Sequence, residues 1–231
     1  MNSRVIIMQI DSFDKQVPNL ILEKKLKKEG YRCIVGLDEV GRGAVAGPVV
    51  AAAVCLPSSF IDNNIPKAFK EVRDSKELNN RKREEIFETV KKNEKIDFGI
   101  GIISEEIIDK INILEATKSA MLQAINNLSS QSDFLILDGN FKIDSKIKQI
   151  SIIAGDQKIF SIALASIIAK VTRDKIMTDY HDLFPEYGFN QNKGYATLLH
   201  RQAINKYGNC LIHRKSFHLK NLRGLGKKDN I

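Results

Sequence analysis

Two kinds of apolar pattern run along the chain, and the first is typical of β-strands. Residues 33–56 are apolar and β-prone at both ends with glycines between, which predicts two strands joined through the glycine-rich segment. Asp97–Ile103 alternates weakly and predicts a third strand. Two short apolar runs, residues 134–137 and 150–154, predict buried strands, and an aspartate follows each of them.

The second pattern has the period of amphipathic helices. It predicts helices within residues 19–29, 74–93, 113–128, 160–180 and 195–208, the second of which is entered through a loop. Gly30 is expected to end the first helix. Ser104 is expected to cap a helix N-terminus, with Glu105 and Glu106 in the positive first turn.

This order of elements predicts the fold class and the domain organisation. Strands with hairpin-like joins come first, helices and strands then alternate, and helices end the chain, which indicates an α/β fold with helices packed on a mixed sheet. The composition shifts too little to separate two independent domains. We expect one main domain over residues 1–185, with residues 1–20 as an N-terminal extension, and a basic helical region over residues 186–231 that packs on it.

The composition excludes several classes of protein. The chain has 231 residues, of which 43% are hydrophobic and 28% charged, as in ordinary folded domains. No apolar run approaches the ~20 residues of a membrane helix, and residues 5–10 are too short for a signal-peptide core. The 3 cysteines include no CxxC pair, which argues against a disulfide framework. We therefore expect a cytoplasmic protein with no membrane association, and we take it to be a monomer, although composition does not bear on the oligomeric state.

The net charge of +8 is concentrated at one end of the chain. The last 31 residues contain eight Lys or Arg and one acid, Asp229, whereas the first 200 residues are nearly neutral. A basic end on a neutral body indicates a polyanion partner such as nucleic acid. A solubilising tail is the alternative explanation of the charge alone.

The adjacent acids Asp38 and Glu39 are the most unusual feature of the first strand pair. Apart from Arg42, they are the only charged residues between Cys33 and Leu56. Carboxylates at the end of a buried strand are unfavourable unless a metal ion or water compensates them. Because neighbouring strand residues point to opposite faces, both acids can serve one site only if the strand bends or ends there.

Asp138 and Asp156 repeat this pattern at the ends of two other apolar strands. Each alone is equally explained as a turn or helix-cap residue. If the strands lie side by side in one direction, the acids converge at one edge of the sheet, where open α/β sheets place their sites. An all-oxygen ligand set favours Mg²⁺ or Mn²⁺ over Zn²⁺, and two such ions are the apparatus of phosphodiester displacement. Together with the basic end, the acids indicate a metal-dependent nuclease.

Several other residues are candidates for substrate contacts. Gly41-Arg42-Gly43 matches no dinucleotide or phosphate-loop motif, but a glycine pair allows close backbone approach to a ligand; a bend between strands is the alternative. Ser166 and Lys170 share a helix face and are candidates for phosphate contacts. An ion pair of Lys170 with Asp174 is the alternative, and for Asp174 we favour it.

The C-terminal region offers two weaker candidates. Tyr195 stands at the entry of the basic helical window, where an aromatic ring either stacks on a sugar or base or packs internally. Cys210, His213 and His218 supply only three potential zinc ligands, so we do not expect a zinc site.

Taken together, these residues resemble bacterial ribonuclease HII. The matching segments appear in the family's order, from about residue 24 to residue 217: GLDEVGRGAVAGPVVAAAV, DSKELN, LILDGN, GDQKIFSIALASIIAKVTRD, NKGYATLLHRQAI and HRKSF. Two departures, Leu164 and the LLHR stretch, touch no catalytic position. Ribonuclease HIII resembles the chain less, because it has a longer N-terminal region and Glu where this chain has Asp156.

The resemblance implies a fold, an activity and a set of site residues. The fold would be ribonuclease H-like, with a mixed five-stranded sheet, flanking helices and a C-terminal helical extension. The enzyme would hydrolyse the RNA strand of RNA–DNA hybrids and cut 5′ of ribonucleotides embedded in duplex DNA, leaving a 3′-OH and a 5′-phosphate. Asp38, Glu39, Asp138 and Asp156 would bind two Mn²⁺ or Mg²⁺ ions.

The resemblance also assigns substrate contacts. Gly41, Arg42 and Gly43 would read the ribose 2′-hydroxyl, and Tyr195 would pack on the adjacent deoxyribose. Lys76 of DSKELN, with Ser166 and Lys170, completes the expected substrate-binding set. Two alternatives from other classes remain open at this stage: a nucleic-acid-binding module without catalysis, and a junction resolvase on the same fold.

Overall fold

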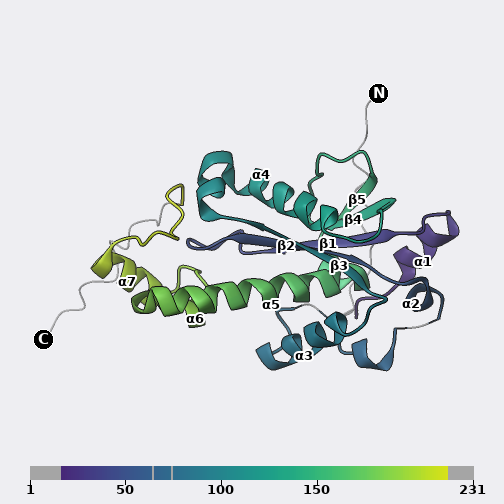
Figure 1. Ribbon diagram of the computed structural model, residues 1–231, viewed down its shortest axis with the longest axis horizontal. Coiled ribbons are helices and arrows are strands. Elements are labelled where there is room, and N and C mark those ends of the chain that lie inside the picture. The colour runs from purple at the N-terminus through teal and green to yellow at the C-terminus, as the bar shows by residue number, and fades with distance from the viewer. Residues whose placement is uncertain (1–16, 64, 74, 218–231) are drawn as a thin grey trace, which may run out of the picture.

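The computed structural model describes residues 17–63, 65–73 and 75–217 (Figure 1). Most of the expected N-terminal extension therefore lies outside the described residues. Asp74 and His218 also lie outside, as do four of the eight basic residues near the C-terminus: Lys220, Arg223, Lys227 and Lys228.

One mixed sheet of five strands forms the centre of the fold, in the order β3-β2-β1-β4-β5. The strands are β1 (Ile34–Val40), β2 (Val49–Cys55), β3 (Asp97–Ile103), β4 (Phe134–Asp138) and β5 (Lys148–Ile152). β2 pairs antiparallel with β1 and β3, whereas β4 pairs parallel with β1 and β5. The predicted α/β fold with a mixed sheet is confirmed.

Helices cover both faces of this sheet (Figure 1). They are α1 (Ile21–Lys28), α2 (Ser58–Asp62), α3 (Asn80–Lys91), α4 (Glu105–Asn126), α5 (Phe160–Leu183), α6 (Phe189–Asn192) and α7 (Leu198–Tyr207), with short 3-10 helices η1 (Lys67–Phe69), η2 (Gly155–Gln157) and η3 (Pro185–Tyr187). α5 and α3 pack on one face through Val50, Ala52 and Val54, and α4 packs on the other through Ala51 and Ala53.

Three local predictions need correction. The join between β2 and β3 is not hairpin-like, because α2, η1 and α3 lie within it. Ser104 occupies the N-cap position of α4, but its side chain makes no capping hydrogen bond. The two helices predicted after Ser104 and from residue 113 join into the single element α4, with a kink between them at Asn112, whose φ is 68° and whose side chain accepts hydrogen bonds from the next turn.

The chain after α5 packs both on itself and on the main body. Tyr187, Phe189 and Ile212 form one apolar cluster with Met177 of α5 and with Ala46, which follows β1. This cluster fixes η3, α6 and α7 beside the loop between β1 and β2. The arrangement positions the C-terminal segment against a loop that lies some 170 residues earlier in the chain.

Two further findings bear on the class of protein. In the described parts of the chain, no helix combines the length and the apolar character that a membrane span requires. The three cysteines are free thiols, as expected, but the sulfur atoms of Cys33 and Cys55 lie only 2.8 Å apart between neighbouring strands.

Candidate active site

Parallel pairing brings two of the four candidate acids to the same level of the sheet. Leu37 of β1 pairs with Leu137 of β4, and the next residues along the two strands are Asp38 and Asp138. Their side chains therefore lie beside one another at the carboxyl ends of neighbouring strands.

The third acid reaches this edge of the sheet through a tight turn. β5 ends at Ile152, two residues earlier than the sequence predicts, so Asp156 belongs to η2 rather than to the strand end. Ala154 has a φ of 53° and turns the chain back. The Gly155 N–H then donates a 2.6 Å hydrogen bond to Asp138 Oδ1. A Cβ on Gly155 would lie 2.6 Å from Cδ1 of Ile162 in α5, so a side chain there would have to displace the end of that isoleucine.

These acids raise one another's pKa values. Asp38 is 5% exposed, and burial, followed by repulsion from Asp138 and Glu39, raises its pKa well above the ordinary value. A hydrogen bond from Ser166 only partly opposes the rise. Burial and then Asp156 raise the pKa of Asp138 in the same way. Ionising the group is therefore unfavourable until a cation arrives.

The fourth acid, Glu39, follows Asp38 directly on β1 and therefore approaches the other acids differently. β1 keeps its regular pairing through the two acids, Asp38 with Ala52 and Glu39 with Ala51, and ends one residue later at Val40. By strand alternation the two side chains leave opposite faces. Burial nevertheless raises the pKa of Glu39, Arg42 opposes the rise and Asp138 adds to it. We refer to Asp38, Glu39, Asp138 and Asp156 as the carboxylate cluster.

Several oxygen atoms of the carboxylate cluster have protein donors. Arg42 Nη1 lies 3.1 Å from Glu39 Oε1, and Lys76 Nζ lies 3.4 Å from Asp156 Oδ2. Glu39 Oε2 is buried and has no hydrogen-bond partner among the described residues. A buried carboxylate oxygen without a donor is costly, and a cation would satisfy it.

The chemistry of the carboxylate cluster fits hard divalent cations. Its ligand atoms are all oxygens, which suit Mg²⁺ and Mn²⁺. No three His, Cys, Asp or Glu side chains of the described residues are already arranged around a common metal position. Arg42 and Lys76 each contact one carboxylate oxygen of the cluster, so these two cations would compete with a metal ion for Glu39 Oε1 and Asp156 Oδ2.

The helix α5 contributes the other polar groups near Asp38. Ser166 is buried, and its hydroxyl lies 2.9 Å from that of Ser75. Lys170 forms an ion pair with Asp174 at 2.7 Å, the arrangement favoured for Asp174 from the sequence. Lys170 therefore has a protein partner in this structure, and its expected phosphate contact stays a prediction.

The two glycines of Gly41-Arg42-Gly43 differ in what surrounds them. Gly41 has a φ of 96°, and a Cβ there would lie 2.2 Å from Arg173 Nε. Gly43 has an ordinary backbone conformation, and no atom lies within 4 Å of its virtual Cβ. Gly41 is thus required by the protein's own packing, whereas Gly43 faces open space. The guanidinium of Arg42 lies over the ring of Phe141, 5.5 Å from its centroid. We call residues 41–48 the glycine-rich loop.

Tyr195 lies close to this loop. The preceding residue, Gly194, accepts hydrogen bonds from the N–H groups of Val45 and Ala46. Tyr195 is 36% exposed as a residue, and the guanidinium of Arg173 lies 5.6 Å from the centroid of its ring. One part of the ring is therefore held by the protein while another part is available to a ligand.

The sequence analysis missed two buried arginines, Arg173 and Arg214. Both have less than 2% exposure, and both donate to backbone carbonyls of the glycine-rich loop. Arg214 is one of the eight residues assigned to the basic end, and its burial excludes it from contact with a polyanion. Arg173 shares the buried face of α5 with Ala169 and Ser166, a periodicity that could have identified it.

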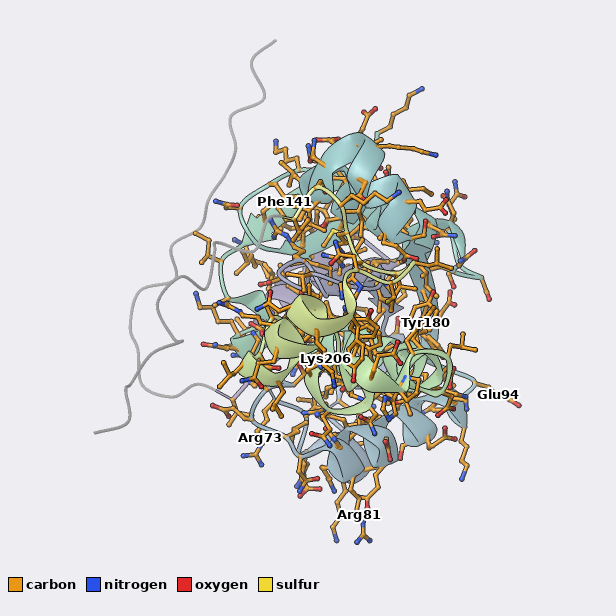
Figure 2. The ribbon with its side chains drawn as sticks, turned by 90° about the vertical axis from the view of Figure 1, so that its left-hand side faces the viewer. Arg73, Arg81, Glu94, Phe141, Tyr180 and Lys206 are labelled. Carbon is orange, nitrogen blue, oxygen red and sulfur yellow. The ribbon has the colours of Figure 1, made fainter. Side chains whose placement is uncertain are left out.

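Figure 2 looks onto the end of the molecule that carries α7. Lys206 of α7 lies near the middle of this view, with Phe141 above it and Arg73 below it. Lys206 and Lys215 are exposed, and Arg201 is half-buried. The described part of the C-terminal region therefore still presents positive charge to solvent.

The comparisons with known proteins agree on one family. The ribonuclease HII family model matches residues 35–220. The ribonuclease HII of Syntrophus aciditrophicus is 47% identical over 201 residues, which cover 87% of this chain and 91% of that protein.

Solved structures share the fold at lower sequence identity. The ribonuclease HII in a complex with PCNA from Archaeoglobus fulgidus aligns with a TM-score of 0.67 and 24% identity, covering 82% of this chain and 96% of that one. A Bst ribonuclease HIII in complex with Mn²⁺ aligns with a TM-score of 0.58 and 19% identity, covering 87% and 69%. These two similarities show the ribonuclease H-like fold.

Proposed function

This chain belongs to the ribonuclease HII family of metal-dependent endoribonucleases, and from that premise we propose its substrate and its mechanism. The enzyme hydrolyses the RNA strand of RNA–DNA hybrids and cuts 5′ of ribonucleotides embedded in duplex DNA. The products carry a 3′-OH and a 5′-phosphate. The reaction serves the removal of misincorporated ribonucleotides and RNA primers, and we expect a cytoplasmic monomer.

One observation carries the proposal: four carboxylates are gathered where burial and mutual repulsion raise the pKa of at least three of them. Such a cluster destabilises the folded chain unless a cation neutralises it. Glu39 Oε2, which is buried and has no hydrogen-bond partner among the described residues, also favours the binding of a cation. We assign all four acids as ligands of two Mg²⁺ or Mn²⁺ ions, which when bound activate the attacking water and stabilise the leaving 3′-oxygen.

The protein's own residues hold the substrate in position for this chemistry. Gly43 leaves room for a ribose against the glycine-rich loop, and a site built to bind a hydroxyl rejects a substrate without it by ~10⁴-fold or more. The exposed part of the Tyr195 ring packs on the neighbouring deoxyribose. Lys76, whose side chain is 79% exposed, moves from Asp156 to a phosphate when the metal binds.

The remaining contacts are weaker. Ser166 and Lys170 lie on α5 next to Asp38 and Asp174, and we propose that both contribute to binding the scissile strand. Basic residues of the region 186–231, which we treat as part of the same domain, supply a salt-dependent grip on the duplex.

The test is a cleavage assay on a DNA duplex that carries one ribonucleotide, with and without Mn²⁺ or Mg²⁺. We expect one cut, 5′ of the ribonucleotide, that requires the metal. An intact strand under all conditions would indicate a binding module without catalysis. Cleavage of an all-DNA branched duplex, with the ribonucleotide ignored, would indicate a junction resolvase.

A further inference from the structure

Arg214 holds the glycine-rich loop in shape through its backbone carbonyls. Its Nε donates to Gly47 O at 2.9 Å, and its Nη1 donates to Ala44 O at 2.7 Å and to Arg42 O at 3.1 Å. The backbone N–H of Arg214 donates to Val45 O as well. Arg214 thus donates to four backbone carbonyls of the glycine-rich loop, those of residues 42, 44, 45 and 47, and this loop follows directly after β1, which carries Glu39 of the carboxylate cluster.

Arg173 supplies a second set of donors from α5. Its three nitrogen atoms donate to Pro48 O, Lys193 O and Ala46 O at 2.7–3.0 Å. Neither guanidinium forms an ion pair with a carboxylate within the described residues, and burial, followed by repulsion from Arg173, lowers the pKa of Arg214. Burying two positive charges in this way is expensive, and the loop carbonyls are what compensates it.

The N–H groups of the glycine-rich loop differ in whether they have a hydrogen-bond acceptor within the protein. Val45 and Ala46 donate to Gly194 O, Gly47 donates to Ile212 O, and Ala44 donates to Gly41 O. Within the described part of the chain, the N–H groups of Arg42 and Gly43 donate to no protein acceptor. With its carbonyls turned toward the arginines, the loop presents two N–H donors beside the open space at Gly43.

The segment that carries Arg214 is itself anchored. Asp109 of α4 accepts hydrogen bonds from the N–H groups of Lys215 and Ser216 at 2.8 and 2.9 Å. Phe217 lies under the guanidinium of Arg214, 5.0 Å from its carbon atom to the ring centroid. The position of Arg214 therefore depends on α4 and not only on the loop that it contacts.

We propose that Arg214 is a positioning residue for ribonucleotide recognition, because it orients the loop that offers the Arg42 and Gly43 N–H groups to the ribose 2′-oxygen. This inference rests on the proposed function, in which the same loop reads the 2′-hydroxyl. Lysine cannot replace arginine here, since a single ammonium group cannot reproduce the planar fork that reaches three carbonyls.

The test measures binding rather than cleavage, with the full chain carrying Asp138→Asn so that the duplex stays intact. Dissociation constants are measured for a duplex with one ribonucleotide and for the all-DNA duplex of the same sequence. We expect Arg214→Lys to lower the preference for the ribonucleotide by about fivefold or more, which is the discrimination supplied by roughly one hydrogen bond. Lys215→Ala, which removes the neighbouring exposed charge, weakens both complexes and leaves their ratio unchanged.

Each outcome decides the inference. A folded Arg214→Lys protein with an unchanged ratio contradicts it, as does a loss of affinity that is equal for both duplexes. If Arg214→Lys does not fold, Asp109→Ala is used instead, because it removes both acceptors that anchor residues 215 and 216 and keeps the arginine; an unchanged ratio there also contradicts the inference. If the Asp138→Asn parent itself shows no preference, the proposed role of the loop fails, and this inference fails with it.

Discussion

The carboxylate cluster and the glycine-rich loop bury charge in opposite ways. The cluster gathers negative groups that repel one another, and one buried oxygen of Glu39 lacks any donor among the described residues. The loop surrounds two buried positive groups, and each of the three nitrogens of Arg173 has a carbonyl acceptor. Mutual repulsion in the first region favours the binding of a cation. In the second region Nη2 of Arg214 also lacks a partner among the described residues, but the other nitrogens of the two guanidinium groups donate to backbone carbonyls and so support the loop.

The largest expected effect comes from the cluster. Asp138→Asn keeps the size of the side chain but removes a charge next to Asp38 and Asp156. We expect cleavage to fall by more than ~100-fold, because even the outer partners of metal ligands affect activity by 10–100-fold. Initial rates on the ribonucleotide duplex measure this.

The matched control for this prediction is Asp144→Asn, which makes the same change at an exposed aspartate after β4. Its rate should stay within about twofold of the parent, since exposed substitutions have small effects. Substantial turnover by the Asp138→Asn enzyme would show that the cluster is not the metal site.

The second prediction compares the stability contribution of Arg173, which is buried against the glycine-rich loop, with that of an arginine on the surface. Arg173→Ala leaves three buried carbonyls without donors, and each such loss costs about 1–3 kcal/mol. We expect a loss of at least ~3 kcal/mol in the free energy of unfolding, measured by urea denaturation. Arg81→Ala removes an arginine whose side chain is 90% exposed and should cost under ~1 kcal/mol. Equal losses in the two variants would mean that Arg173 has no special structural role.

A third prediction concerns pH and metal together. The pKa values of Asp38, Glu39 and Asp138 are raised in the folded chain. Their contribution to stability is therefore fully present below the ordinary carboxyl pKa and is lost as the pH rises through the raised values. The metal-free protein should become less stable over that range, and saturating Mn²⁺ should reverse the loss.

This prediction is measured as melting temperature against pH with and without Mn²⁺. At 100 times the dissociation constant, a ligand of the folded state adds ~2.7 kcal/mol. Asp38→Asn provides the control, because it should raise the metal-free melting temperature near pH 8 and reduce the response to Mn²⁺. A melting temperature that ignores Mn²⁺ at every pH would count against a metal site.

The smallest expected change in stability distinguishes the two glycines of the loop. Gly41→Ala should destabilise the protein by ~1–3 kcal/mol, since a side chain there meets Arg173 and requires a positive φ. Gly43→Ala should leave stability within ~0.5 kcal/mol and still slow ribonucleotide cleavage, because its methyl group enters the open space. Full activity in a folded Gly43→Ala enzyme would remove this space from the proposed substrate site.

Much of the fold could be predicted because it depends on local pattern. Asp97–Ile103 is a strand over the range expected from its alternation, and Gly30, with a φ of 101°, follows the first helix. Boundaries failed where tertiary contacts override the pattern. β5 ends early because the turn at Ala154 and the hydrogen bond from Gly155 to Asp138 draw the chain away from the sheet.

The site could be predicted in part. Acids at strand ends are visible in the sequence, and the parallel pairing of β1 with β4 shows Asp38 and Asp138 at one level. The arginines were not predicted, because a cation such as Arg173 in a helix, or Arg214 in a basic segment, normally indicates a solvated surface. Only the carbonyls supplied by a distant loop make the burial of Arg173 and Arg214 possible.

The amino-acid sequence by itself determined the fold class, the family and the acids that we assign to the metal site, because hydrophobic period and residue type are local properties of the chain. The tertiary structure decided which charges are compensated. It placed the carboxylates of three separate segments within repulsive reach of one another, and it buried Arg214 against a loop some 170 residues away. Compensation depends on the distances between charges, and only the packing of the whole chain sets those distances.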